Sequence, residues 1–513
     1  MKKAILIIFV FCFFKQFSFG QTMFQKTYSP GLLYSQAGAS WSSVIQNYDG
    51  GYTILSGYFY SYLVKTNSLG DTLWTKSYNI AFPYCFQKTT DGGYIILGGD
   101  GKIILFKTDS IGNILWSKNY GNSTGHLDNG YSVQQTNDGG YIIGANILQP
   151  AIGYRIYIVK TDSFGNIQWT KRFYYGTAFG NSNNVSVVQT SDGNYVVSGT
   201  MIIPPNQNIV LLKFQSNGNL IWSKCYTTLS SNSDQQFDLK QTNDEGFIIV
   251  GLAGGNLYNS LYLIKTDSIG NVNWSKSYGI LNSAYPYSVC ATNDGGYIFT
   301  GFEYGIPEDI YIIKTDDNGN ISWSKSYGAQ GYDGGTCVKQ TLDGGYVLTG
   351  YTEGVWPTPK GFFLIKTDSL GNSGCNESIP FDSIVGTPSI SISNFTPVIN
   401  SFDSVTNVSI TMFPTDSIFV TQCPFTGVNE TDKEPLSINI YPNPFSDQTI
   451  FMFSAEQKNT TIRITDLLGK EIRTMNFEGR QLVLDKSEMK AGIYFVQTTD
   501  EKKNIINKKI IIQ

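Results

Sequence analysis

The residues best suited to nucleophilic or acid–base chemistry are few. The chain has a single histidine, His126, with Asp128 two positions later. A Ser-His-Asp triad would have to use this histidine, because its imidazole is the base that activates the serine. We expect no nucleophile elbow of the G-x-S-x-G type to mark the serine of such a triad. We therefore expect His126 to be an ordinary loop residue, and we assign no catalytic residue.

Paired carboxylates offer a second route to catalysis, because glycoside hydrolysis needs two acids a few ångströms apart. Acidic residues occur in the segments between predicted strands, at Asp128, Asp234, Glu303, Glu308, Asp309, Asp333 and Glu353. They follow no common motif and the sequence gives no separations, so we assign them no roles. A glycan-degrading hydrolase or lyase stays open as an alternative function.

Metal-binding patterns are weak. No two cysteines form a C-x-x-C pair, the spacing of many zinc and redox sites. Asp316, Asn318 and Asn320 imitate the first half of an EF-hand loop, but Ile321 replaces the required glycine. We expect these side chains to bond to their own turn, and we predict no metal or other cofactor.

Six cysteines remain after the N-terminal segment. Four of them, Cys85, Cys225, Cys290 and Cys337, lie in predicted strands and are expected to be small buried hydrophobic residues. Cys375 and Cys423 flank a segment after the repeats, and they could form a disulfide in an oxidising compartment. Whether they pair stays open.

A degenerate repeat supplies the elements that must position these side chains. Its first half reads D-G-G-Y, as at Asp138–Tyr141, and its second half reads K-T-D-S-x-G-N-x-x-W-S-K-x-Y-G, as at Lys107–Gly121. A period of about 40–50 residues is typical of propellers and arrays. Each copy holds four β-like runs, the composition of a propeller blade. In the third copy these runs are Tyr131–Thr136, Tyr141–Gly144, Arg155–Thr161 and Asn166–Phe173. We therefore predict an all-β fold in which residues 21–373 form a seven-bladed β-propeller.

The ends of the repeat region predict how the ring closes. The last copy lacks its W-S-K-x-Y strand, and Phe24–Tyr28 matches that pattern with Phe in place of Trp. We expect Phe24–Tyr28 to pair with Phe362–Thr367, which leaves no unpaired terminal blade. The repeated Trp and Tyr are expected to pack between neighbouring blades.

The variable segments of the repeats indicate where a ligand would bind. The connections between the second and third strands, and between blades, differ from copy to copy, whereas the two hairpin turns are nearly invariant. In a propeller the variable connections share one face, and binding usually occurs on such loops. They carry aromatic residues that could stack on sugars or hold an extended peptide. Our candidate ligand-binding residues are Tyr154, Tyr258, Tyr304 and Trp356. The alternative, that these rings pack against blade edges, stays open.

Two further regions follow the propeller. Residues 374–436 have no repeat and are predicted to be a linker or a small β appendage. Residues 437–513 contain successive β-like runs, the pattern of a small Ig-like β-sandwich. Their motifs closely resemble the C-terminal sorting domain of the type IX secretion system. The residues that carry this resemblance are Tyr441, Pro442, Asn443, Pro444, Asp466, Gly469, Gly492 and Tyr494. The resemblance implies that the secretion machinery recognises this domain at the outer membrane and that the cargo is released or attached to the surface.

The N-terminus is typical of a signal peptide. Lys2 and Lys3 precede the apolar run Ala4–Phe14, with a plausible cleavage site before Gln21. Residues 1–20 are therefore expected to direct export into the periplasm. No later segment is long and apolar enough to span a bilayer, so the mature protein is expected to have no transmembrane helix.

Composition narrows the function further. The 513 residues include 53 glycines, 41% hydrophobic and 15% charged residues, with a net charge of −4. This composition suits a β-rich globular protein, and without a basic cluster we expect no nucleic-acid partner. We predict a secreted or cell-surface binding or scaffold protein exported by the type IX secretion system, with a polysaccharide or a protein as its ligand. The alternatives are the hydrolase or lyase and a structural adhesion component.

Overall fold

The structure is a computed structural model. It describes residues 21–29, 41–121, 128–149, 153–174, 184–228, 233–254, 259–279, 284–303, 309–328, 332–352, 361–374, 377–378, 384–386, 390–393, 398–400, 405–407, 412–414, 418–423, 438–441, 443, 445–466, 470–487, 489–499 and 505–512. The predicted signal peptide, residues 1–20, lies outside this set. The chain divides into two compact units after residue 427. All elements of the described residues are strands, and none of these residues forms a helix that could cross a membrane.

The first unit contains seven blades, and each blade has four strands of its own except the seventh, whose fourth strand is β1 (Phe24–Ser29). Blade 1 consists of β2 (Trp41–Gln46), β3 (Tyr52–Gly57), β4 (Ser61–Thr66) and β5 (Thr72–Tyr78). Blade 2 consists of β6 (Cys85–Lys88), β7 (Tyr94–Gly98), β8 (Ile103–Thr108) and β9 (Ile114–Tyr120). Blade 3 consists of β10 (Asn129–Gln135), β11 (Tyr141–Gln149), β12 (Gly153–Thr161) and β13 (Ile167–Tyr174). Blade 4 consists of β14 (Ser186–Gln189), β15 (Tyr195–Ile203), β16 (Asn206–Phe214) and β17 (Leu220–Thr228).

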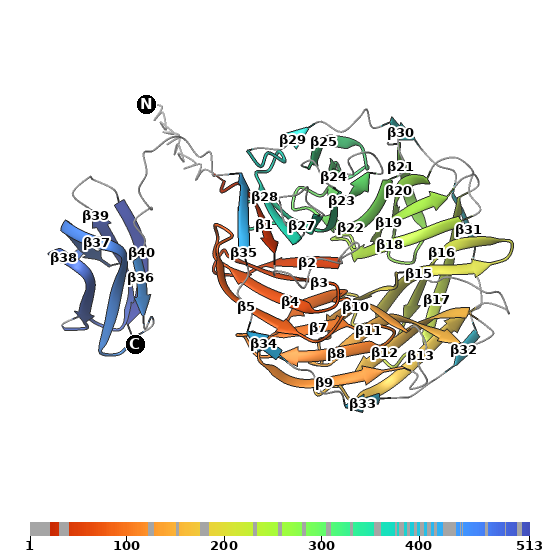
Figure 1. Ribbon diagram of the computed structural model, residues 1–513, viewed down its shortest axis with the longest axis horizontal. Helices are drawn as coiled ribbons and strands as arrows, with labels where there is room; N and C mark the ends of the chain where they lie inside the picture. Colours follow the sequence, from red (N-terminus) through yellow and green to blue (C-terminus); the bar gives the residue numbers. More distant parts are fainter. Residues whose placement is uncertain are drawn as a thin grey trace, which may run out of the picture. The chain divides into compact units, whose positions relative to one another are not determined.

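The remaining blades follow the same order. Blade 5 consists of β18 (Ser233–Gln241), β19 (Phe247–Gly254), β20 (Asn259–Thr266) and β21 (Val272–Gly279). Blade 6 consists of β22 (Ala284–Ala291), β23 (Tyr297–Glu303), β24 (Asp309–Thr315) and β25 (Ile321–Tyr327). Blade 7 consists of β26 (Asp333–Gln340), β27 (Tyr346–Thr352) and β28 (Gly361–Thr367), completed by β1. The blades are antiparallel sheets arranged in a ring (Figure 1), as the repeat predicts.

The ring closes through the N-terminal strand. β1 runs antiparallel to β28, with Phe24 opposite Lys366 and Tyr28 opposite Phe362. The amide of Gln25 also donates to the hydroxyl of Ser373 at 2.8 Å. The predicted pairing of Phe24–Tyr28 with Phe362–Thr367 is thus confirmed.

The repeated tryptophan and tyrosine join each blade to the next. A Cβ placed on Gly165 of blade 3 would lie 2.8 Å from the ring of Trp116 in blade 2. The hydroxyl of Tyr120 donates to the carbonyl of Gly165 at 2.6 Å. The glycine of this turn is therefore required twice, for its φ of +76° and for the close approach of the indole. Tyr78, Tyr226, Tyr278 and Tyr327 make the same hydrogen bond to Gly112, Gly270, Gly319 and Gly371.

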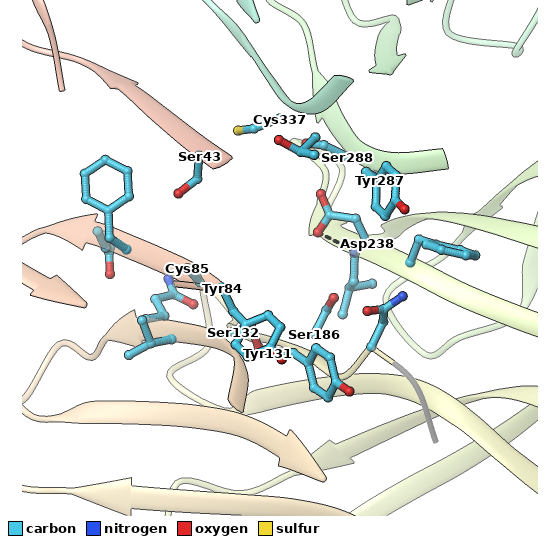
Figure 2. Close-up of a pocket in the computed structure, with 18 of the residues that line it drawn as sticks. Ser43, Tyr84, Cys85, Tyr131, Ser132, Ser186, Asp238, Tyr287, Ser288 and Cys337 are labelled. Atoms are coloured by element: carbon cyan, nitrogen blue, oxygen red, sulfur yellow. Dashed lines mark hydrogen bonds between the residues drawn. The ribbon is translucent and has the colours of Figure 1, made fainter. Parts of the chain in front are cut away.

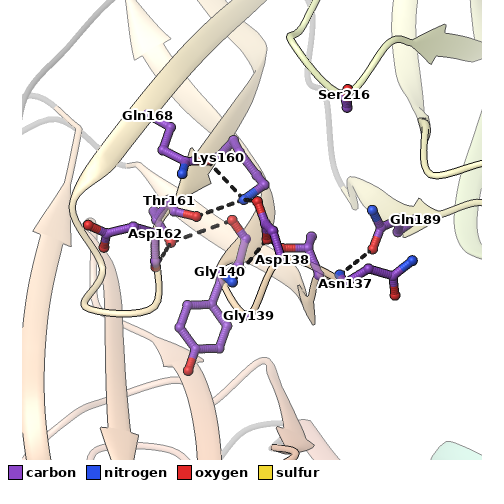
Figure 3. Close-up of polar contacts among 12 residues, drawn as sticks. Asn137, Asp138, Gly139, Gly140, Lys160, Thr161, Asp162, Gln168, Gln189 and Ser216 are labelled. Carbon is purple, nitrogen blue, oxygen red and sulfur yellow. Dashed lines mark hydrogen bonds and ion pairs between the residues drawn. The ribbon is translucent and has the colours of Figure 1, made fainter.

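The two invariant halves of the repeat meet inside each blade, as Figure 3 shows for blade 3. The ammonium of Lys160 lies 2.8 Å from the Asp138 carboxylate and donates to the carbonyl of Thr161, also at 2.8 Å. Burial raises the pKa of Asp138, but hydrogen bonds from Lys160 and Thr136 outweigh it and hold this pKa below its usual value. Equivalent ion pairs are Lys65–Asp49, Lys107–Asp91, Lys213–Asp192, Lys265–Asp244, Lys314–Asp294 and Lys366–Asp343.

The segment after the propeller differs from the linker or small β appendage that we expected. Its described strands each add a fifth strand to one blade, next to that blade's outer strand (Figure 1). In chain order they pair with blades 6, 5, 4, 3, 2, 1 and 7. We call these seven strands the belt: β29 (Glu377–Ser378), β30 (Ile384–Gly386), β31 (Ile390–Ser393), β32 (Val398–Asn400), β33 (Val405–Asn407), β34 (Met412–Pro414) and β35 (Ile418–Cys423).

The second unit is a small β-sandwich, as predicted. Its strands are β36 (Ile438–Tyr441), β37 (Gln448–Thr465), β38 (Glu471–Asp485), β39 (Gly492–Thr499) and β40 (Ile505–Ile512). The start of β37 pairs with β36 and its end pairs with β39, so one long strand joins both. Phe451, Ile462, Ile464 and Ile510 are fully buried in its core.

Candidate functional site

A cavity of about 350 Å³ lies at the centre of the propeller, lined by the inner strand of every blade. These strands are β2, β6, β10, β14, β18, β22 and β26. Each of them begins after a variable connection and ends at the invariant Asp-Gly-Gly turn. The cavity therefore has one end toward the variable face and the other toward the constant face. Figure 2 shows side chains that line it.

Four aromatic side chains line the cavity near the variable face: Tyr84, Tyr131, Phe237 and Tyr287. The rings of Tyr84 and Tyr131 are 5.4 Å apart, and those of Phe237 and Tyr287 are 5.9 Å apart. All four are only partly buried. We call this group the aromatic mouth.

The aromatic mouth continues outward along the variable connections of blades 1 and 2. Phe82 stacks near Tyr84 with ring centres 6.3 Å apart, and Tyr58 lies 4.8 Å from Phe82. Phe59, which is 52% exposed, lies 4.7 Å from Tyr58. On the other side, Phe302 lies 5.8 Å from Tyr287. The aromatic surface thus runs from an exposed loop to the cavity.

A ring of equivalent positions lies below the aromatic mouth: Ser43, Cys85, Ser132, Ser186, Asp238, Ser288 and Cys337. Some of these side chains join adjacent blades. The Ser132 hydroxyl accepts the N–H of Val187 at 3.0 Å, and the Asp238 carboxylate accepts that of Val289 at 3.1 Å. The buried Ser43 hydroxyl forms no hydrogen bond with any described residue.

The deepest layer carries the positive charge of the cavity. The Lys240 ammonium lies 2.5 Å from the Asp238 carboxylate, so these two charges compensate each other. Lys339, from blade 7, forms no ion pair or hydrogen bond within the described residues. Burial lowers the pKa of Lys339, but the acidic groups of Cys337, Cys290 and Asp238 raise it above its usual value.

Two of the acids considered for catalysis have structural roles. Asp128 is 1% exposed and accepts the N–H of Leu148 at 3.0 Å. Asp234 is equally buried and accepts both the N–H and the hydroxyl of Thr228, at 2.7 and 2.6 Å. Both carboxylates therefore hold the ends of blade connections.

Three other acids from the same set come together at the variable edge of blades 6 and 7. Glu303 and Asp309 face each other across β23 and β24, and Asp333 begins β26. Burial, and then the charges of Asp333 and Glu303, raise the pKa of Asp309 to about 6. Glu308 and Glu353 lie outside the described residues.

Of the four aromatic candidates, Tyr154 is in the described part of the chain. It is the second residue of strand β12. Burial, together with the nearby Tyr154, raises the pKa of Tyr131 to about 12. Tyr154 thus adjoins the aromatic mouth. Tyr258, Tyr304 and Trp356 lie outside the described residues and stay predictions, as does a Cys375–Cys423 disulfide, because Cys375 also lies outside.

The four rings of the aromatic mouth were not predicted from the sequence, because Tyr131, Phe237 and Tyr287 lie on inner strands and Tyr84 directly precedes one, so none lies in a variable loop. A signal was present: each ring stands seven residues before the aspartate of an Asp-Gly-Gly turn. The expectation that no Gly-x-Ser-x-Gly pattern marks a serine is wrong, because residues 121–125 carry this pattern directly before His126. Residues 122–127 lie outside the described residues, so a role for His126 stays untested.

The cysteines and turn carboxylates show no arrangement for a metal. Cys85 and Cys337 line the cavity and Cys225 is buried in blade 4. The thiols of Cys85, Cys225, Cys290 and Cys337 are free. Asp316 accepts the N–H groups of Asn318 and Asn320 at 3.0 and 2.8 Å, so it bonds to its own turn as predicted. No group of three metal-binding side chains occurs among the described residues.

The sorting motifs fix the edge of the second unit. The Asn443 side chain donates to the carbonyl of Lys509 at 2.9 Å and accepts the N–H of Ile511 at 2.8 Å. Asp466 accepts the N–H of Lys470 at 2.9 Å. Tyr494 is buried and its hydroxyl donates to the carbonyl of Lys490. Pro442, Pro444 and Gly469 lie outside the described residues.

Comparison with protein families identifies this second unit. Residues 439–513 match the secretion system C-terminal sorting domain. A curated relative, an endo-acting ulvan lyase of Formosa agariphila, is 36% identical over 78 residues. That match covers 15% of this chain and 15% of the lyase, so this chain spans only a small part of its relative.

Similar solved structures are distant. PorZ, a surface component of the type IX secretion system of Porphyromonas gingivalis, is 9% identical, with a TM-score of 0.39 over 92% of this chain and 59% of PorZ. A protein of unknown function from Dyadobacter fermentans is 11% identical, with a TM-score of 0.42 over 68% of this chain and 98% of that protein. At these values the likenesses carry no functional argument.

Proposed function

We propose that this chain, which carries a type IX secretion sorting domain and is thereby directed to the cell surface or the medium, binds an extended ligand through its aromatic mouth. The secretion machinery recognises the sorting domain, and the propeller is the functional cargo. The continuous aromatic surface from Phe59 to Tyr131 is the observation that carries this proposal.

The physical support is that large aromatic rings are left partly exposed beside a cavity. Burying such rings against a ligand removes apolar surface from water, which stabilises a complex. Aromatic faces also suit sugar rings and extended peptides. The propeller core does not need these side chains to be exposed, because Trp and Tyr at the blade junctions already join the blades.

A second candidate function, hydrolysis or lysis of a glycan, is favoured by Asp309. A carboxyl group with a pKa of about 6 is still partly protonated near neutral pH, as a general acid must be. Glu303 and Asp333 would supply the other carboxylates. This activity would use the same variable face.

A glycan array followed by product analysis tests both functions. We expect the purified protein to bind a subset of glycans, and a Tyr84→Ala/Tyr131→Ala variant to lose at least about tenfold in affinity, since two stacking rings are removed. Phe164→Ala is the matched control, because Phe164 is 69% exposed on a constant turn. Unchanged binding in the double variant would overturn the site, and cleaved products lost in Asp309→Asn would establish the second candidate.

A further inference from the structure

We infer that the central cavity holds the carboxylate of an acidic sugar residue, with Lys339 as its ionic anchor. This inference names the ligand class of the proposed binding site and rests on that function. It begins with three charged groups in the cavity lining: Asp238, Lys240 and Lys339. Because Asp238 and Lys240 are paired at 2.5 Å, one positive charge remains.

Lys339 is the cation of the cavity that has no direct ion pair with a described residue. Its ammonium forms no ion pair or hydrogen bond within the described residues, although it is partly buried at the centre of the ring. Leaving a charge in such a position without a partner is costly, unless a ligand supplies one. One ammonium supplies one positive charge, which matches a monoanionic carboxylate; dianionic phosphate is more often held by several cations or by the fork of an arginine.

The order of side-chain types along the cavity favours an acidic sugar as the molecule that bears this carboxylate. A ligand that enters from the variable face would first meet the rings of Tyr84, Tyr131, Phe237 and Tyr287. It then meets small polar side chains, among them Ser43, whose hydroxyl lacks a hydrogen-bond partner among the described residues. Aromatic faces, hydroxyl groups and a deeper cation are the partners that a uronic acid requires for its ring, its hydroxyls and its carboxylate.

The size of the cavity indicates how much of the ligand enters. A volume of about 350 Å³ lies near the lower end of the range of small-molecule sites, roughly 300–1,000 Å³. The cavity therefore suits one terminal residue of a glycan. The rest of the chain would lie on the aromatic surface that continues to Phe59.

The test compares an acid with its ester. Calorimetric titration would use the full protein with oligogalacturonate, oligoglucuronate and oligomannuronate, and with the fully methyl-esterified form of each. We expect the wild-type protein to bind at least one free acid about tenfold or more tightly than its ester, since hydrogen bonds to charged groups are worth about 1.5–3 kcal/mol.

The variant Lys339→Met then tests whether Lys339 causes this preference for the free acid over its ester. It keeps the length of the side chain and removes the charge, and we expect it to bind acid and ester equally. Its thermal midpoint should not fall, because Lys339 makes no ion pair or hydrogen bond to lose. Lys102→Met is the control, since Lys102 is exposed on a loop of the same face. The ester comparison on the wild-type protein needs no variant, so it decides the question even if Lys339→Met folds poorly.

The outcomes separate the two proposals. If the wild-type protein binds acid and ester equally and Tyr84→Ala/Tyr131→Ala loses glycan affinity, the inference of a bound carboxylate is wrong. The proposed function then still stands. Binding of acidic peptides with no binding of any glycan overturns the sugar class. No change in any glycan or peptide affinity on removal of Tyr84 and Tyr131 overturns the proposed function itself.

Discussion

The ring of Phe24 lies against Gly70, where a Cβ on this glycine would meet the ring at 2.7 Å. At each of the other six blade junctions a tryptophan packs against the equivalent glycine. The hydroxyl of Tyr28 donates to the carbonyl of Gly70, as the repeated tyrosines do elsewhere. The N-terminal strand thus makes a complete blade junction between blades 7 and 1.

Replacing Phe24 with alanine should therefore open the ring at this junction. Phe24 is 3% exposed, and removal of a buried phenylalanine typically costs about 3–5 kcal/mol. Phe164→Ala is the control, because Phe164 is 69% exposed and should change stability by less than about 0.5 kcal/mol. Equilibrium denaturation of both variants measures the difference, and equal stabilities would contradict the closure.

Two glycines of blade 3 separate backbone strain from packing. Gly139 and Gly165 have φ angles of +80° and +76°, but a Cβ on Gly139 meets nothing within 4 Å, whereas one on Gly165 meets Trp116 at 2.8 Å. Gly139→Ala should cost about 1 kcal/mol from the backbone alone. Gly165→Ala should cost a further 1–3 kcal/mol, roughly, from overpacking. Urea denaturation of both variants would rank their losses in free energy of unfolding. Equal losses would mean that Trp116 can move aside at little energetic cost.

The stability of the protein should depend on the ionisation of Asp309. Its pKa is raised from 3.8 to about 6 in the folded state, so the folded protein holds this proton more tightly than the unfolded chain. The resulting stabilisation is complete below the unfolded pKa and is lost as pH rises through about 6. Asp309→Asn should therefore raise the thermal midpoint above pH 6, with little effect near pH 4.

Asp100→Asn is the matched control for this pH series, because Asp100 is exposed on a loop of the same face. It reports the effect of removing one negative charge from the surface. Thermal denaturation of both variants between about pH 4 and pH 8 gives the comparison. A midpoint gain for Asp309→Asn that does not vary with pH would contradict the raised pKa.

The belt should contribute to the stability of the propeller. A protein that ends at residue 427 keeps all seven belt strands, whereas one that ends at residue 374 loses them and exposes the outer strand of every blade. Exposed outer strands are free to pair with other chains. We expect the shorter protein to melt at lower temperature and to associate in sedimentation experiments. Equal melting of the two proteins would show that the belt is dispensable.

The repeat made most of the fold predictable. The same residues make the same contacts in successive blades. These recurring features are the Asp-Gly-Gly turns, the Lys–Asp ion pairs and the tryptophan contacts. Even the displaced strand Phe24–Tyr28 could be recognised, since it keeps the alternation of the repeated strand.

The belt was not predicted, because its strands are two to six residues long and are stabilised by pairing with distant blades. Local sequence carries little information about such pairing. One signal was available: apolar residues start six of the seven strands at intervals of six to eight residues, at Ile384, Ile390, Val398, Val405, Met412 and Ile418.

The candidate binding surface could be anticipated only in part. Reasoning from variable loops placed ligand binding on the face where the aromatic mouth lies, and it named Tyr154, which adjoins the aromatic mouth. It did not find Tyr84, Tyr131 or Lys339. Their roles depend on which strand positions converge on the axis, and this follows from ring geometry that a single repeat does not reveal.

Strand β1 lies between β28 and β35, so one sheet combines residues 24–29 with residues 418–423. The chain cannot complete this sheet until residues 418–423 are available to pair with β1. A chain cut short at any earlier point would lack the final strand of blade 7. The seventh sheet therefore joins the start of the propeller to the last belt strand before the sorting domain.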